Sequence, residues 1–217
     1  MSNSGPSTAA TPKRQARSEA VRRALLDAAV KEFAACGFEG ASTRAIATRA
    51  GTHQPQITYH FTSKEELWRA AVDHLFGQMN EMLAESLAPE GDTPAIATRE
   101  GLASAIRAIV RGAAQLPELH RIMVQEATAD SERLAWIVDR HIRPSVDVVV
   151  GAWREMRDRG EVLPIEDGVF YYLVTGGASL AYVNAAEARL LGFDPLDARF
   201  VEAHADALVA MVLGSNP

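Results

Sequence analysis

The chain has 217 residues, 47% of them apolar, so it is long enough to bury a sizeable core in one or two domains. Its single cysteine, Cys36, excludes a disulfide framework, and the start of the chain lacks the runs typical of a secretory signal, so we expect a cytoplasmic protein. The net charge of −6 is unevenly divided. Residues 1–64 hold nine Lys/Arg and four Asp/Glu, a charge of +5, and the rest carries −11. A basic N-terminal part of this kind suits a nucleic-acid partner despite the negative total.

The N-terminal part predicts a disordered tail over residues 1–15 and a first helix over 17–36 that ends at Gly37. Apolar residues recur along this helix at intervals of three and four, which indicates one buried face. They are Val21, Leu25, Ala28, Ala29 and Phe33. The basic residues Lys13, Arg14 and Arg17 form either an ordinary solvated cluster or an arm that reaches DNA.

Residues 42–64 predict two short helices with a tight turn between them. Ser42 or Thr43 can cap the first helix, and Gly51 can close it in the left-handed conformation. The second helix, 54–61, has Pro55 in its first turn, where a missing N–H costs nothing. Its apolar residues face the first helix and leave a polar outward face. A helix with such a face can lie in a DNA major groove and read base edges.

The remainder of the chain predicts only helices, and alternating strand patterns are absent, so we expect an all-α fold. A helix over 64–87, capped by Thr62 or Ser63, is followed by a loop at Pro89–Pro94. Pro144 should kink the third of the helices that follow, and Asp194 with Pro195 should start the last. These helices are predicted over 94–115, 117–127, 131–159, 166–190 and 195–213.

The most apolar stretch, residues 169–186, could be read as a membrane span or as a buried helix. It contains Thr, Ser and Asn and is flanked by Asp167 and Glu187, so we predict no membrane insertion. The preferred interpretation is a helix with one side against a second subunit, because Gly176 and Gly177 let another helix approach closely. The segment 177–181 is similar to a nucleophile elbow but lacks its final glycine and a preceding strand.

Patterns for catalysis, metals and nucleotides are missing. No two of the six histidines are four residues apart, and neither glycine-rich nucleotide motif occurs. We therefore predict no catalytic residue, no metal and no cofactor, and a protein that is not an enzyme.

Four blocks in the N-terminal part occur in a recognisable order and spacing. They are Phe33 with Gly37-Phe38, S-T-R-A-I-A-x-x-A-G at 42–51, Q-P-Q-I-T-Y-H-F at 54–61, and S-K-E-E-L at 63–67. Together they resemble the DNA-binding domain of the tetracycline-repressor (TetR) family. The resemblance implies a helix-turn-helix domain at 16–63 and a helical ligand-binding and dimerisation domain at 64–217.

The resemblance also implies which residues bind DNA. The expected base-edge contacts are Arg44, Gln54, Pro55 and Thr58, and the expected backbone contacts are Thr43, Tyr59, His60 and Lys64. The chemistry agrees, since Arg can pair with guanine, Gln with adenine, and proline can pack on a thymine methyl. Two positions depart from the family pattern. Thr58 stands where a tyrosine is usual, and His53 stands where a small capping residue is usual.

Family members are homodimers through their last two helices, here 166–190 and 195–213, and release a pseudo-palindromic operator when a small molecule binds. The effector's expected contacts, which favour an apolar or aromatic molecule, are His120, Met123, Trp136, His141, Trp153, Tyr171 and Tyr172. We therefore expect a repressor whose effector changes the separation of the two DNA-binding domains. The alternative is a helical ligand-binding or enzymatic protein that does not act on DNA.

Overall fold

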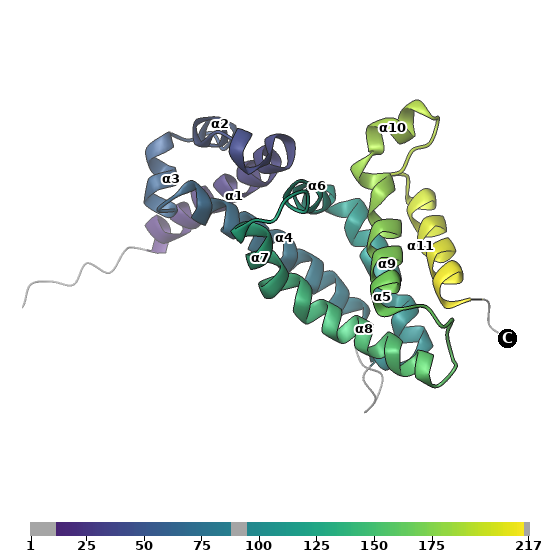
Figure 1. Cartoon of the computed structure of the whole chain (residues 1–217). Coiled ribbons are helices and arrows are strands. Elements are labelled where there is room, and N and C mark those ends of the chain that lie inside the picture. The colour runs from purple at the N-terminus through teal and green to yellow at the C-terminus, as the bar shows by residue number, and fades with distance from the viewer. Residues whose placement is uncertain (1–11, 88–94, 215–217) are drawn as a thin grey trace, which may run out of the picture. The chain divides into compact units, whose positions relative to one another are not determined.

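The structure is a computed structural model of the whole chain and describes residues 12–87 and 95–214 (Figure 1). The predicted loop Pro89–Pro94 and most of the predicted tail lie outside these ranges. No strand occurs in the part described, so the all-α prediction is confirmed. The chain divides into two compact units between His74 and Leu75, and helix α4 contributes residues to both.

The first unit contains three helices and the start of a fourth. They are α1 (Pro12–Gly40), α2 (Thr43–Arg49), α3 (Gln54–His60) and α4 (Lys64–Ser86). Residues 12–15, predicted to be disordered, are helical, because Pro12 is well suited to a first helical turn. Gly37 breaks the helical conformation inside α1 with a φ of 68°, as its position in the sequence predicts.

A compact core holds the helices of the first unit together. Phe33 stacks on Phe38 with ring centroids 6.1 Å apart, and Phe38 meets the buried Trp68 edge-on at the same distance. Leu25 and Leu67 are also fully buried. Burying side chains of this size contributes about 1.5 to 3 kcal/mol each. This core therefore supplies the stability that the short helices α2 and α3 lack.

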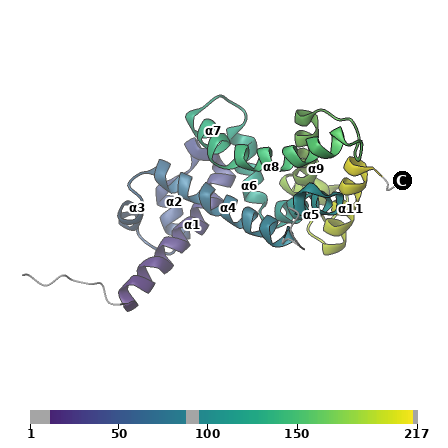
Figure 2. The ribbon, with the colours of Figure 1, turned by 90° about the horizontal axis from the view of Figure 1, so that it is seen from below.

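The second unit contains the end of α4 and the remaining helices. These are η1 (Ala95–Ala97), α5 (Arg99–Gln115), α6 (Pro117–Glu126), α7 (Glu132–Ile137), η2 (Val138–Ile142), α8 (Arg143–Asp158), α9 (Asp167–Val183), α10 (Ala185–Leu190) and α11 (Ala198–Leu213). Figures 1 and 2 show α5, α9 and α11 side by side. Their shared core includes Trp153, which stacks on Phe170 with centroids 4.2 Å apart, and Tyr182.

Four predicted helices in this unit differ from the structure. The helix predicted over 94–115 begins at Arg99, where Thr98 is the N-cap of α5, and the short η1 precedes it. The helix predicted over 131–159 is divided by a π-helical turn, η2, just before Pro144, which lies in the first turn of α8. Pro144 cannot donate a backbone hydrogen bond, so a carbonyl in the preceding turn loses its helical donor. Next to it, the Ser145 hydroxyl donates to the His141 carbonyl at 3.2 Å. Such π turns are rare and are frequent at functional sites.

The other two corrections concern polar residues that end or start helices. The helix predicted over 166–190 breaks at Asn184, whose side chain donates to Glu187 at 3.4 Å. The last helix begins at Ala198 instead of 195, because Asp197 is its N-cap and accepts from the backbone N–H groups of Arg199 and Phe200.

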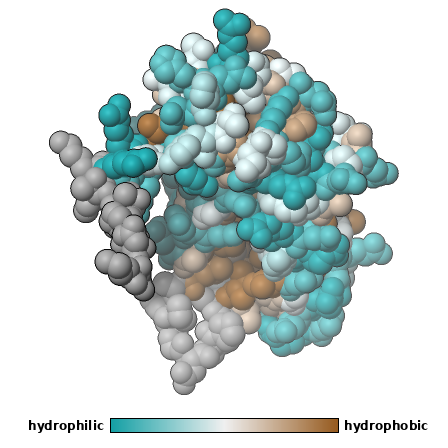
Figure 3. Space-filling view, turned by 90° about the vertical axis from the view of Figure 1, so that its left-hand side faces the viewer, coloured by the Kyte–Doolittle hydropathy of each residue, from teal (hydrophilic) through white to brown (hydrophobic). Residues whose placement is uncertain are grey.

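Apolar side chains are mostly turned inward, and the face seen in Figure 3 is largely hydrophilic, with hydrophobic residues gathered in one area. Among the described helices, none has the length and apolarity needed to cross a membrane.

A buried polar link joins α9 to α11. The Tyr182 hydroxyl lies 3.0 Å from His204 Nδ1, and His204 Nε2 lies 2.9 Å from the Gly177 carbonyl. A carbonyl can only accept, so Nε2 carries the proton and Tyr182 donates to Nδ1. Burial, with a smaller effect of the Glu202 carboxylate, raises the pKa of Tyr182 to about 12.

We expect this link to make the free energy of unfolding fall as pH rises from about 10 towards 12. The unfolded tyrosine loses its proton near its ordinary pKa of about 10 while the folded one keeps it, so unfolding becomes favoured by up to about 1.4 kcal/mol per pH unit. Tyr182→Phe should remove this contribution. Denaturant unfolding between pH 8 and pH 11.5 should show the gap between wild type and variant narrowing. Tyr59→Phe, at a 70% exposed site, is the control. A gap that stays constant would contradict this account.

Candidate DNA-binding and effector sites

Helices α2 and α3 form a helix-turn-helix pair whose local signals behave as the sequence predicts. The Ser42 hydroxyl caps α2 by accepting from the Ala45 N–H at 3.4 Å. Gly51 takes a φ of 66° in the turn, and Pro55 lies in the first turn of α3. Ile46 and Ile57 are buried and anchor the pair to the core. His53 occupies the N-cap position of α3 without a side-chain hydrogen bond, in line with its departure from the family pattern.

The outward face of the pair brings several predicted DNA contacts together. Gln54, Pro55 and Thr58 are exposed on α3, and Arg44 is exposed on α2. Gln54 Nε2 donates to Thr43 Oγ1 at 3.4 Å, so the two helices share a polar contact at this face. A face of exposed amide, hydroxyl and guanidinium groups can hydrogen-bond to base edges and phosphates.

An open depression on α2 adds residues that the sequence reasoning missed. Its volume is about 550 Å³, and it is lined by Ser42, Arg44, Ala45, Thr48 and Arg49. The spacing of residues 44, 45, 48 and 49, which places them on one side of a helix, was the available signal.

His60 and Lys64, both predicted backbone contacts, are held by the protein itself. Burial and the nearby Arg22 lower the pKa of His60, which favours its neutral form. Lys64 Nζ lies 4.8 Å from the ring centroid of Phe38 and donates to the Glu39 carbonyl at 3.3 Å. These contacts hold Lys64 at the start of α4. The hydrogen bond to Glu39 uses one of the three N–H donors of its ammonium group.

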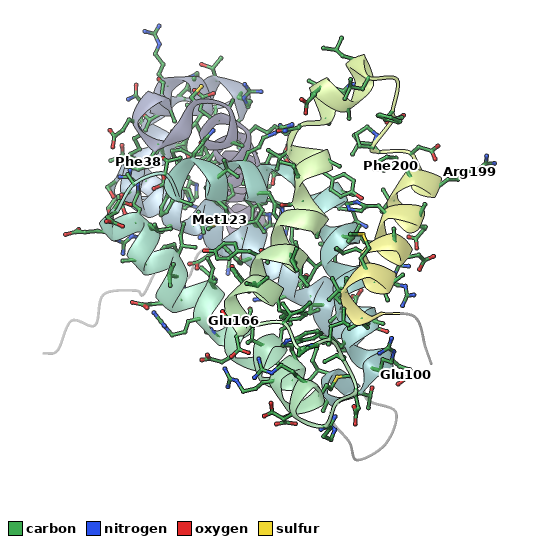
Figure 4. All side chains as sticks on the ribbon, turned by 45° about the vertical axis from the view of Figure 1, so that its right-hand side comes forward. Phe38, Glu100, Met123, Glu166, Arg199 and Phe200 are labelled. Atoms are coloured by element: carbon green, nitrogen blue, oxygen red, sulfur yellow. The ribbon has the colours of Figure 1, made fainter. Side chains whose placement is uncertain are left out.

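The predicted effector residues do not form one site. Trp153 is fully buried in the core, where its Nε1 donates to the Ile165 carbonyl at 3.4 Å. Tyr172 lies at the surface with 73% exposure, and its ring meets the half-buried Tyr171 edge-on. His120 and Met123 are half-buried on α6, which is labelled at Met123 in Figure 4. Burial lowers the pKa of His120, and the Leu116 backbone partly opposes this.

Two predicted effector residues do meet, at the π-helical turn. His141 stacks on Phe76 with ring centroids 4.3 Å apart and a tilt of 4°, and Trp136 approaches His141 edge-on at 5.4 Å. Arg140 lies 5.8 Å from the Trp136 ring. Phe76 was not among the predicted residues. Its only signal in the sequence was its spacing along α4. An ordinary core residue has the same spacing, so the sequence could not single out Phe76.

A groove of about 460 Å³ opens where α9, α10 and α11 meet. Its walls include Gly176, Gly177, Leu180 and Leu191, and Phe200 lines it from the start of α11 (Figure 4). No sequence motif marked this groove. Within the described ranges, no group of three or more His, Cys, Asp or Glu side chains is placed to hold a metal ion.

The short helices α2 and α3, with the tight turn between them and an exposed polar face, have the arrangement of a helix-turn-helix motif. Residues 25–71 match the family model described as bacterial regulatory proteins, tetR family. This match over residues 25–71 agrees with the resemblance of the chain's motifs to the TetR family.

Two curated relatives match about a third of the chain. It is 33% identical over 78 residues to the HTH-type transcriptional repressor NicS of Pseudomonas putida. It is 36% identical over 81 residues to the HTH-type transcriptional repressor KstR2 of Rhodococcus jostii. Each match covers 36% of this chain, and they cover 37% and 40% of the two relatives. The similarity thus spans less than half of each relative.

A solved structure resembles the chain over most of its length. AibR, in complex with isovaleryl coenzyme A and operator DNA, superposes with a TM-score of 0.64 and 22% identity, covering 90% of this chain and 100% of the AibR chain. At this identity the likeness shows the fold alone.

Two substitutions should separate base reading from backbone contact. We expect Arg44→Ala to reduce the preference for operator over unrelated DNA by about 1 to 3 kcal/mol, because a bidentate contact with guanine is lost. Lys64→Ala should weaken binding to every duplex alike and lower the slope of log affinity against log salt by about one. Fluorescence anisotropy over a salt series measures both. Equal melting temperatures would show that folding is intact, and identical effects of the two variants would contradict the assignment.

Proposed function

We propose that this chain is a sequence-specific transcriptional regulator, a homodimer that represses from a pseudo-palindromic operator and is released by a small molecule. The observation that carries this proposal is the exposed face of the helix-turn-helix pair, where Thr43 and Gln54 are hydrogen-bonded and Arg44 stands free of core packing. The predicted contacts Pro55, Thr58, Tyr59, His60 and Lys64 extend this face. No catalytic step is part of the proposal.

The binding of DNA is tested first. A gel-shift titration of the full chain on the DNA flanking its coding region, with an unrelated duplex as competitor, should reveal a specific complex. Because phosphate contacts release counterions, its affinity should fall steeply between about 50 and 200 mM salt. If the flanking DNA shows no preference, a genome-wide selection of bound fragments follows. Failure to recover any preferred sequence would reject the regulator and favour a helical protein that does not act on DNA.

The homodimer is proposed because one side of α9 is apolar and uncovered. Tyr172 is 73% exposed and Leu180 62% exposed. Helical spacing places the exposed members of this side in one stripe. They are Val169, Tyr172, Leu173, Gly176 and Leu180. An exposed apolar stripe of this kind marks an interaction surface.

The surroundings of the stripe suit a second copy of the chain. Asp167 is the only charged residue of α9, so the stripe carries no basic residue for a lipid headgroup. On α11, Met211 is 75% exposed, and Ala203 and Ala207 are exposed and small enough for close helix packing. More exposed apolar side chains follow α9, on α10 and the segment after it. They are Leu190, Leu191, Phe193 and Leu196. A two-fold axis would let identical stripes cover each other.

Leu180→Asp should convert the dimer into a monomer, because it places a charge in the centre of the proposed interface. Sedimentation equilibrium of wild type and variant measures the change, and operator affinity should fall with it, since a monomer holds a single half-site. Val148→Asp, at a 55% exposed site on α8, is the matched control and should leave the dimer intact. A Leu180→Asp protein that is still dimeric would reject this interface.

The effector is proposed to be an apolar or aromatic small molecule. The stacked Phe76 and His141 rings, with Trp136 edge-on to His141 at the π-helical turn, support this class. His120, Met123, Tyr171 and Tyr172 remain candidates. Trp153 is held by core packing and is the weakest of the set. An effector can release the operator only by its difference in affinity between the DNA-bound and free conformations. Small molecules can be screened for release of the protein from the operator fragment that the gel-shift titration identifies.

A further inference from the structure

A buried carboxylate in the first unit has no part in the proposed DNA contacts. Glu32 lies on α1 and is 7% exposed. Among the side chains described in residues 14–87 it is the only buried charged one. Burying a carboxylate is costly unless its oxygens are paired, so its partners indicate what it does.

Both oxygens of Glu32 contact helix α2. Oε1 accepts a hydrogen bond from the backbone N–H of Ser42 at 3.3 Å, and Oε2 lies 3.8 Å from Arg49 Nη2. Ser42 is the N-cap of α2 and Arg49 is its last residue. One carboxylate on α1 therefore contacts both the N-cap of α2 and the side chain of its last residue.

Helix α2 depends on outside contacts for its orientation. It has only seven residues, which is too short to be stable by its own hydrogen bonds. Ile46 and Ala47 bury one side of it, and apolar packing of this kind tolerates small rotations. Two polar contacts made by residues at opposite ends of α2 restrict such rotation: the hydrogen bond to the Ser42 N–H is directional, and the ion pair limits the distance between Glu32 and the Arg49 side chain.

The orientation of α2 bears directly on the outward face. Arg44 projects from α2, and Thr43 of the same helix accepts the hydrogen bond from Gln54 of α3. A shift of α2 would therefore move Arg44 and break the contact that holds Gln54.

We propose that Glu32 is a positioning residue for operator recognition, which sets the orientation of Arg44 and Gln54 by fixing both ends of α2 to α1. The proposal rests on the proposed function as a DNA-binding regulator. Glu32 touches no DNA in this account. Glu32 affects the preference for the operator over other sequences. The contacts with the DNA phosphate backbone depend on Glu32 less than the base-edge contacts do.

The test compares full-length variants on the operator and on an unrelated duplex over a salt series. Glu32→Leu removes both contacts. Glu32→Gln keeps an acceptor for the Ser42 N–H and loses the ion pair. Asp27→Asn removes the same charge from α1 at a 60% exposed side chain, which lies 3.9 Å from His74 Nε2, so it controls for the loss of a negative charge on this helix. Melting temperature and the free energy of unfolding measure folding in each variant.

We expect Glu32→Leu to reduce the ratio of operator to unrelated-duplex affinity by at least about ten-fold, with Glu32→Gln intermediate. Affinity for the unrelated duplex should change no more than in Asp27→Asn. Should Glu32→Leu fail to fold, the same comparison is made with Glu32→Gln. A ratio that stays at the wild-type value while both affinities fall with the folded fraction would show a structural role only and overturn the proposal.

The test distinguishes failure of the proposed function from failure of the proposed role of Glu32. A wild-type protein without preference for any DNA would reject the regulator and this inference together. A wild-type protein with a clear preference, and Glu32 variants with an unchanged ratio, would reject only the inference.

Discussion

The DNA-reading face depends on the burial of a few side chains beneath two very short helices. Helices α2 and α3 have seven residues each, and isolated helices of that length do not persist in water. Ile46 and Ile57 hold them to a core that includes Phe33 and Trp68. Burial of Ile46 and Ile57 therefore positions the polar groups of the outward face, and the Thr43–Gln54 hydrogen bond links the two helices there. In the proposed role, the polar contacts of Glu32 fix the orientation of α2, whose other contacts with the core are apolar.

In the second unit, burial of apolar side chains is incomplete on one side of α9. Helices α5, α8, α9 and α11 share one core around Trp153 and Phe170, and this core covers only one side of α9. The other side keeps Tyr172 and Leu180 in solvent. A large uncovered apolar stripe is costly for a single chain in water. The proposed dimer would remove this stripe from water.

Residue type alone left several roles open. Trp153 and Tyr172 looked alike as large aromatic candidates for an effector site, yet the first is fully buried and the second is largely exposed. Lys64 is similar. The resemblance to the family implies a phosphate contact, and the structure shows its ammonium beside Phe38 and the Glu39 carbonyl. An ammonium with three donors can satisfy both roles.

What the sequence determined by itself was local or periodic. The cap at Ser42, the left-handed Gly51 and the apolar spacing of the helices depend on residues a few positions apart. The start of the last helix was predicted at Asp194 and Pro195, and only the structure showed that Asp197 is its cap. The family motifs are also contiguous, so the DNA-binding part could be recognised. Only the tertiary structure decided which distant residues meet. Glu32 reaching both ends of α2 and Phe76 stacking on His141 join positions far apart in the chain. The break of α9 at Asn184 likewise had no clear signal inside an apolar run. Such features arise from packing between helices, to which the spacing of residues along one helix gives no guide.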